Sequence, residues 1–116
     1  NLAPRDDHIA PLPSVFKLAR HFGGDTRLVV ARSGHVAGIV NPPAARKYSY
    51  WTNEKGADTP QAWLAAATEH PGSWWPDWQR WLAPHCGQQV PSRHPGEGKL
   101  KPLEDAPGHY VKLRAD

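Results

Sequence analysis

The stretch RLVVARSGH, residues 27–35, decides the expected fold. Its first five residues are too short for a helix, rich in Val, and apolar on both alternating faces, which is typical of a central strand in a parallel sheet. Ser33, Gly34 and His35 follow as a turn at the carboxyl end of that strand. In open α/β sheets, ligands and catalytic groups gather at this edge. The sequence therefore predicts an α/β fold with His35 at the edge that carries chemistry.

A helix is expected just before this strand. Apolar residues recur at helical spacing over residues 14–22, and Gly23 and Gly24 follow as a stop signal. Loop, helix, strand and loop in this order resemble half of a βαβ unit. We expect residues 1–12 to be a loop and the first strand of the unit to lie at or before residue 1.

Two further helices are expected downstream. Thr59 as the cap and Pro60 at the first position open one of them. Ser73 as the cap and a Trp-rich apolar stripe over residues 74–82 indicate the other. From residue 84 onward, frequent Pro and Gly predict an irregular tail, in which only residues 110–113 alternate like an edge strand.

Composition excludes several classes of protein. The 116 residues carry a net charge of +3 from dispersed basic residues, which argues against a nucleic-acid surface. No run of about 18 apolar residues exists, so no membrane-spanning helix is expected. The single cysteine, Cys86, excludes an intrachain disulfide and favours an intracellular protein. The chain has six Trp among many Pro and Gly, and it starts without Met. These features favour an internal piece of a protein that packs against a larger sheet.

Asp7 and His35 are the candidates for chemistry. They lie 28 residues apart, at the two ends of the predicted helix–strand unit. If the preceding strand is parallel to residues 27–31, both emerge at one edge, where a carboxylate can accept the imidazole N–H while the other ring nitrogen faces a nucleophile. The acid precedes the His, as in the α/β-hydrolase order. The spacing alone leaves open that His35 is a structural surface residue and that Asp7 is a helix cap.

Other chemistry finds little support in the sequence. The His residues have no metal-site spacing, so no metal site is expected, and no nucleotide-binding glycine motif points to a cofactor. Cys86 lacks the preceding Gly and strand of a nucleophile elbow, so we interpret it as an incidental thiol. The Trp stripe fits a packing face better than a stacking platform for sugars or bases.

Several unusual strings, in order, resemble the C-terminal third of polyhydroxyalkanoate synthases, and two of them, WWPDW and GIVNPP, look closer to the class I enzymes. The strings are DDHIAP (6–11), SGHVAGIVNPP (33–43), YWTN (50–53), EHPGSWWPDWQRWL (69–82) and APGHYVKL (106–113). The resemblance implies that residues 1–83 are the C-terminal portion of an α/β-hydrolase catalytic domain and residues 84–116 an extended tail. It also implies a cytoplasmic enzyme at the surface of polyester granules.

The resemblance further implies an acyltransferase that polymerises (R)-3-hydroxyacyl-CoA into polyester and releases CoA. The family's site is Cys–Asp–His. Its Asp precedes a His-Ile pair and corresponds to Asp7, and its His lies in the SGH string and corresponds to His35. By this resemblance His35 is the base for the thiol, and Asp7 either orients His35 or activates the incoming 3-hydroxyl. His8 is a candidate supporting residue. Two residues depart from the family pattern. Arg32 stands where the family usually has a small residue, and Asp6 stands where it usually has Glu.

The family's nucleophilic Cys lies upstream in a G-x-C-x-G motif that this chain lacks, so the chain alone is expected to be inactive. The implied partners are the acyl-CoA substrate, the growing polyester chain and the missing N-terminal part of the enzyme, and a homodimer is left open. Two alternatives also remain open at this point. One is a piece of an esterase or depolymerase of the same fold. The other is a non-catalytic module that binds a partner chain or a granule.

Overall fold

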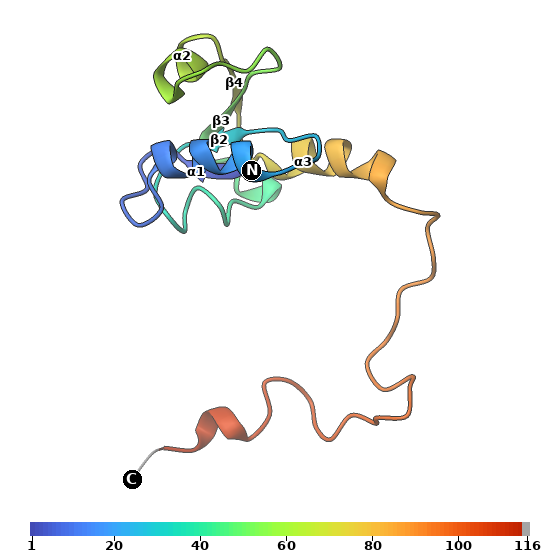
Figure 1. The fold of residues 1–116 in the computed structure, drawn as a ribbon. Coiled ribbons are helices and arrows are strands. Elements are labelled where there is room, and N and C mark those ends of the chain that lie inside the picture. Colours follow the sequence, from blue (N-terminus) through green and yellow to red (C-terminus); the bar gives the residue numbers. More distant parts are fainter. Residues whose placement is uncertain (115–116) are drawn as a thin grey trace. The chain divides into compact units, whose positions relative to one another are not determined.

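The computed structural model describes residues 1–114 of the chain. By its internal contacts the chain divides into two units, Asn1–Cys86 and Gly87–Asp116. The first unit is built on a sheet with helices around it, and the second is mostly irregular (Figure 1).

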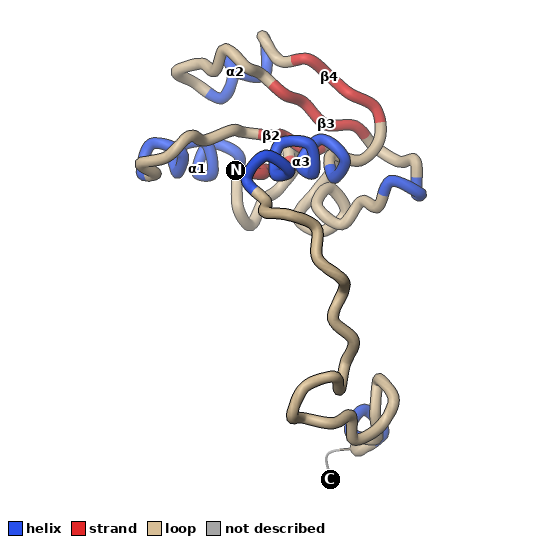
Figure 2. The backbone as a smooth tube through the Cα atoms, turned by 90° about the vertical axis from the view of Figure 1, so that its right-hand side faces the viewer, coloured by secondary structure: helices blue, strands red, loops and turns tan. Residues whose placement is uncertain are grey.

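The first unit contains a four-stranded mixed sheet in the order β1-β2-β3-β4 (Figure 2). Its strands are β1 (Leu2–Pro4), β2 (Val29–Ala31), β3 (Ser49–Thr52) and β4 (Thr68–Pro71). β1 and β2 are parallel, whereas β3 and β4 join in antiparallel fashion. The predicted central strand is confirmed at β2, which is buried along its whole length. The sheet is mixed rather than purely parallel.

The position of β1 corrects the sequence analysis. Residues 1–12 were expected to be a loop with the partner strand at or before residue 1, but the partner strand is Leu2–Pro4, inside the chain. Three residues ending in Pro carry too little periodicity to mark a strand. β3 and β4 were also missed, so the first unit contains four strands where one was expected. Both are four residues long and acquire their strand conformation by pairing with each other and with β2.

All three predicted helices are confirmed, with shifted ends. They are α1 (Leu12–Leu18), which continues as a 3-10 turn over Ala19–His21, α2 (Pro60–Ala65) and α3 (Trp75–Leu82). Thr59 caps α2, because its hydroxyl oxygen accepts the N–H of Ala62 at 3.2 Å. Ser73 accepts the N–H of Trp75 at 3.1 Å, although the capping position itself is taken by Trp74.

One face of the sheet holds the hydrophobic core. Ala3, Val30 and Trp51 are paired across β1, β2 and β3, so their side chains share that face. Leu12 of α1 and Trp63 of α2 complete the buried cluster. Because side chains alternate along a strand, the residues on either side of Trp51 point to the opposite face.

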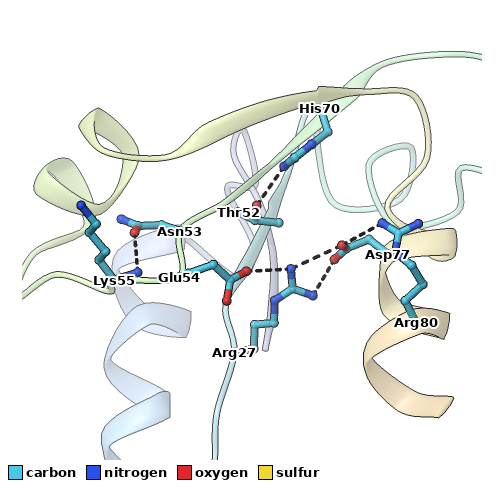
Figure 3. Close-up of polar contacts among 8 residues, drawn as sticks. All are labelled: Arg27, Thr52, Asn53, Glu54, Lys55, His70, Asp77 and Arg80. Atoms are coloured by element: carbon cyan, nitrogen blue, oxygen red, sulfur yellow. Dashed lines mark hydrogen bonds and ion pairs between the residues drawn. The ribbon is translucent and has the colours of Figure 1, made fainter. Parts of the chain in front are cut away.

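A polar network on the opposite face fastens α3 to the sheet. Arg27, just before β2, contacts Asp77 of α3 through both terminal nitrogens, at 2.7 and 3.3 Å, and also reaches Glu54 at 3.2 Å (Figure 3). Arg80 contacts the same Asp77 at 3.2 Å. Since Asp77 is buried, these hydrogen bonds satisfy a carboxylate that would otherwise destabilise the fold. Nearby, the hydroxyl of Thr52 lies 2.9 Å from Nε2 of His70.

Between residues 87 and 114, the second unit forms one regular element, a 3-10 turn at Tyr110–Lys112, so the edge strand expected at residues 110–113 is wrong. Local turn bonds from Lys112 to His109 and from Leu113 to Tyr110 take the place of strand pairing. A short alternating pattern forms a strand only beside a partner strand, and none is present among the described residues of this unit. Within residues 1–114, every helix is too short to cross a membrane.

Candidate active site

The loops that follow β1 and β2 run side by side, and this brings Asp7 and His35 together. The N–H of Arg5 donates to the carbonyl of Ala31 at 2.7 Å, and the N–H of Asp6 donates to the carbonyl of Ser33 at 3.2 Å. The parallel pairing of β1 with β2 therefore continues past both strand ends. The two loops keep one register up to the residues that carry the candidate site.

Asp7 and His35 form a direct hydrogen bond. Nδ1 of His35 lies 2.7 Å from Oδ2 of Asp7. The Asp7 side chain is 1% exposed, whereas the His35 side chain is 46% exposed. The carboxylate is thus enclosed and the imidazole is open to solvent. Within residues 1–114, Nε2 of His35 makes no hydrogen bond, so it is free to meet a reacting group.

The Asp7 carboxylate is held at both oxygens. Oδ1 accepts the backbone N–H groups of Ile9 at 2.8 Å and Ala10 at 3.0 Å. Burial raises the pKa of the Asp7 carboxyl, but hydrogen bonds from Ala10, His35 and Ile9 outweigh it and leave the pKa below its ordinary value. The group is therefore a carboxylate at neutral pH, and its two oxygens have different partners.

His35 begins a compact turn over residues 35–40. Ser33 has a positive φ of 85°, which bends the chain sharply out of β2. The N–H of Val40 donates to the carbonyl of Val36 at 2.8 Å, and the N–H of Gly38 donates to the carbonyl of Gly34 at 3.2 Å. A side chain at Gly38 would place its Cβ 2.7 Å from the carbonyl oxygen of Arg32. Only glycine lets the turn lie this close to the end of β2.

The other residues singled out in the sequence lie outside this pair. His8 is exposed and makes no side-chain hydrogen bond within residues 1–114. Arg32 points along the sheet, with its guanidinium 5.9 Å from the centre of the Trp51 ring and 3.7 Å from Glu69. It therefore engages β3 and β4 rather than the Asp7–His35 pair. Cys86 is exposed and follows the 3-10 turn after α3.

Sequence reasoning missed the backbone groups that hold the pair. The N–H groups of Ile9 and Ala10 carry no side-chain signal, and only the Asp two or three residues before them hints at such a turn. The carbonyl of Ile39 was also missed. It accepts hydrogen bonds from the indole N–H groups of Trp74, at 3.1 Å, and Trp75, at 3.0 Å.

An enclosed carboxylate that orients an open imidazole, at the carboxyl ends of two parallel strands of an α/β sheet, has the geometry of an acid–base pair that serves a nucleophile.

No family model matches the sequence. Curated proteins do match it. The chain is 52% identical over 114 residues to the poly(3-hydroxyalkanoate) polymerase subunit PhaC of Rhizobium etli, covering 98% of this chain and 18% of that protein.

Two further relatives give the same result. The poly(3-hydroxyalkanoate) polymerase of Methylorubrum extorquens is 50% identical over 99% of this chain and 19% of its own length. The PhaC subunit of Cupriavidus necator is 44% identical over 96% of this chain and 19% of its own length. The chain belongs to the poly(3-hydroxyalkanoate) polymerase family, as the resemblance predicted. It spans about a fifth of the length of these relatives and matches their C-terminal part.

Proposed function

We propose that this chain is the acid–base segment of a poly(3-hydroxyalkanoate) polymerase with an α/β-hydrolase fold. The substrate would be an (R)-3-hydroxyacyl-CoA thioester, which the enzyme adds to a growing polyester with release of CoA. The 2.7 Å hydrogen bond between Asp7 and His35, at the edge of the two parallel strands, is the observation that carries the proposal. The family resemblance adds a cytoplasmic location at the surface of polyester granules.

In this mechanism His35 is the general base. A cysteine thiol from another part of the enzyme gives its proton to Nε2 of His35, and the resulting thiolate attacks the thioester carbon. CoA leaves as a thiolate and takes the proton from the His35 imidazolium, and the acyl group remains on the cysteine. The 3-hydroxyl of a second acyl group then loses its proton to the neutral His35 as its oxygen attacks the acyl-cysteine. One ester bond forms, the thioester bond to the cysteine breaks, and the departing cysteine thiolate takes the proton back from His35.

Asp7 would orient His35 rather than activate the 3-hydroxyl directly. Its side chain is enclosed, Oδ1 is occupied by two backbone N–H groups, and Oδ2 is occupied by His35. A substrate hydroxyl would have to displace one of these partners to reach the carboxylate. The contacts therefore favour a role in which Asp7 fixes the tautomer of the imidazole and stabilises the imidazolium that forms.

The decisive experiment replaces His35 in a polymerase that carries this segment. His35→Ala should abolish CoA release from 3-hydroxybutyryl-CoA while leaving the thermal unfolding midpoint nearly unchanged, because the side chain is half exposed. His8→Ala is the matched control, since His8 is an exposed histidine beside Asp7, and Cys86→Ala tests the one thiol in the segment. Both controls should keep near-normal rates. A His35→Ala enzyme with a normal rate and normal stability would refute the assignment.

A further inference from the structure

Two neighbouring tryptophans converge on a single backbone oxygen next to the candidate site. The indole N–H groups of Trp74 and Trp75 both donate to the carbonyl of Ile39, at 3.1 and 3.0 Å. A carbonyl oxygen has two lone pairs, so it accepts both donors without competition. Consecutive indoles aimed at one acceptor are not required for packing. The arrangement therefore uses the N–H groups as well as the apolar surface of the rings.

Both donors are presented from a fixed support. Trp74 precedes the first turn of α3 and Trp75 begins it, and α3 is fastened by the contact of Asp77 with Arg27 (Figure 3). The segment before the helix is also held, because the N–H of Gly72 donates to the carbonyl of Tyr48 at 2.9 Å. The two indoles thus lie on a segment that hydrogen bonds hold to the sheet on both sides.

The acceptor belongs to the turn that carries His35. Ile39 lies four residues after His35, and its own N–H donates to the carbonyl of Val36 at 3.1 Å. Gly38 lies against the carbonyl of Arg32, which leaves the turn little room to slide. A restraint on the carbonyl of Ile39 is therefore transmitted through the hydrogen-bonded turn to the backbone of His35. The imidazole of His35 has one hydrogen-bond partner within residues 1–114, the carboxylate of Asp7.

We infer that Trp74 and Trp75 are positioning residues for His35, acting through the carbonyl of Ile39. The inference rests on the proposed function of His35 as general base. It gives a role beyond packing to the first two residues of the WWPDW string, whose indoles hold the turn at residues 35–40 so that the imidazole stays within reach of Asp7. Neither tryptophan touches the reacting atoms.

The test removes the indole N–H groups in a polymerase that carries this segment, first by replacement with Phe, which keeps an aromatic side chain of smaller size. Loss of one hydrogen bond typically changes an equilibrium by about fivefold, so Trp74→Phe and Trp75→Phe should each lower kcat only by about that factor. The double variant leaves the carbonyl unpaired and should lower kcat by about fiftyfold or more, with KM nearly unchanged. Trp81→Phe is the matched control, because this indole lies on the same helix, makes no hydrogen bond within residues 1–114 and packs against His85, whereas Trp78 packs against Trp74 itself.

A second variant separates positioning from packing. 3-Benzothienylalanine has the shape of tryptophan without its N–H, so its incorporation at both positions removes only the donors. We expect it to lower kcat as the double Phe variant does, at a thermal midpoint close to that of the parent enzyme. A kcat equal to that of Trp81→Phe, in the folded benzothienyl enzyme, would overturn the inference. If His35→Ala is inactive in the same assay, that failure leaves the proposed function standing, whereas an active His35→Ala enzyme removes both.

Discussion

Replacing Asp7 by Asn separates the charge of this side chain from its shape. Oδ1 accepts two backbone N–H groups, from Ile9 and Ala10, and this contact decides which way the new amide will face. An NH₂ group turned toward two N–H donors would lose both hydrogen bonds, so the amide oxygen keeps this position. The NH₂ group is then left facing Nδ1 of His35.

This orientation forces the imidazole into the wrong tautomer. Nδ1 must accept the amide N–H, so the single proton of the neutral ring moves to Nε2, which can no longer take a proton from a thiol. In hydrolases with the same acid–base arrangement, this substitution lowers kcat by about 10⁴-fold with the geometry intact. We expect a loss of that order in Asp7→Asn, with substrate binding and the fold retained.

The assay is CoA release from 3-hydroxybutyryl-CoA by a polymerase that carries this segment, measured beside the thermal midpoint. Asp6→Asn is the matched control, because Asp6 is an exposed carboxylate one residue away whose backbone N–H, not its side chain, is held by the carbonyl of Ser33. It should retain the parental rate. If Asp7→Asn loses less than about tenfold in kcat, the carboxylate does not set the tautomer of His35 and this account of the mechanism is refuted.

Two further predictions follow from the same geometry. Gly38→Ala should destabilise the fold by about 1–3 kcal/mol and lower kcat, because its Cβ would meet the Arg32 carbonyl at 2.7 Å. Gly23→Ala is the control and should do neither, since the space around Gly23 is open. Equal denaturation midpoints for the two variants would contradict the close contact at Gly38. The pKa of Asp7 is lowered in the folded state, so the ionised carboxylate stabilises the fold fully above about pH 4. This stabilisation is lost as the pH falls through the pKa that Asp7 has in the folded state. Urea midpoints measured from pH 6 to pH 2 should therefore fall less steeply for Asp7→Asn than for the parent chain.

Sequence patterns predicted the elements whose signals are local. The Thr59–Pro60 start of α2 and the β-branched run at β2 each carry their own physical cause, namely a cap and a buried apolar strand. β1, β3 and β4 were missed because strands of three or four residues are decided by their partners, which lie up to 27 residues away. The expected strand at residues 110–113 failed for the same reason, since alternation without a partner produced a turn.

The candidate site divides in the same way. Asp7 and His35 could be proposed from sequence because both follow the expected unit and both match the family strings, and the structure places their side chains in contact. The partners that hold them could not be proposed. Backbone N–H and carbonyl groups have no residue identity, and the pairing of Trp74 and Trp75 with Ile39 spans 35 and 36 residues.

The continued pairing of the loops after β1 and β2 has a consequence for engineering. Because Arg5 and Asp6 are hydrogen-bonded to Ala31 and Ser33, Asp7 meets His35 only when each loop keeps its length from strand to site residue. A one-residue insertion in either loop would displace one partner by about 3.3 Å and turn its side chain to the other face of the sheet. Chimeric polymerases should therefore exchange residues 2–41 as a single cassette, with both crossovers outside it. In the same loops, single-residue deletions should lower activity more than substitutions do.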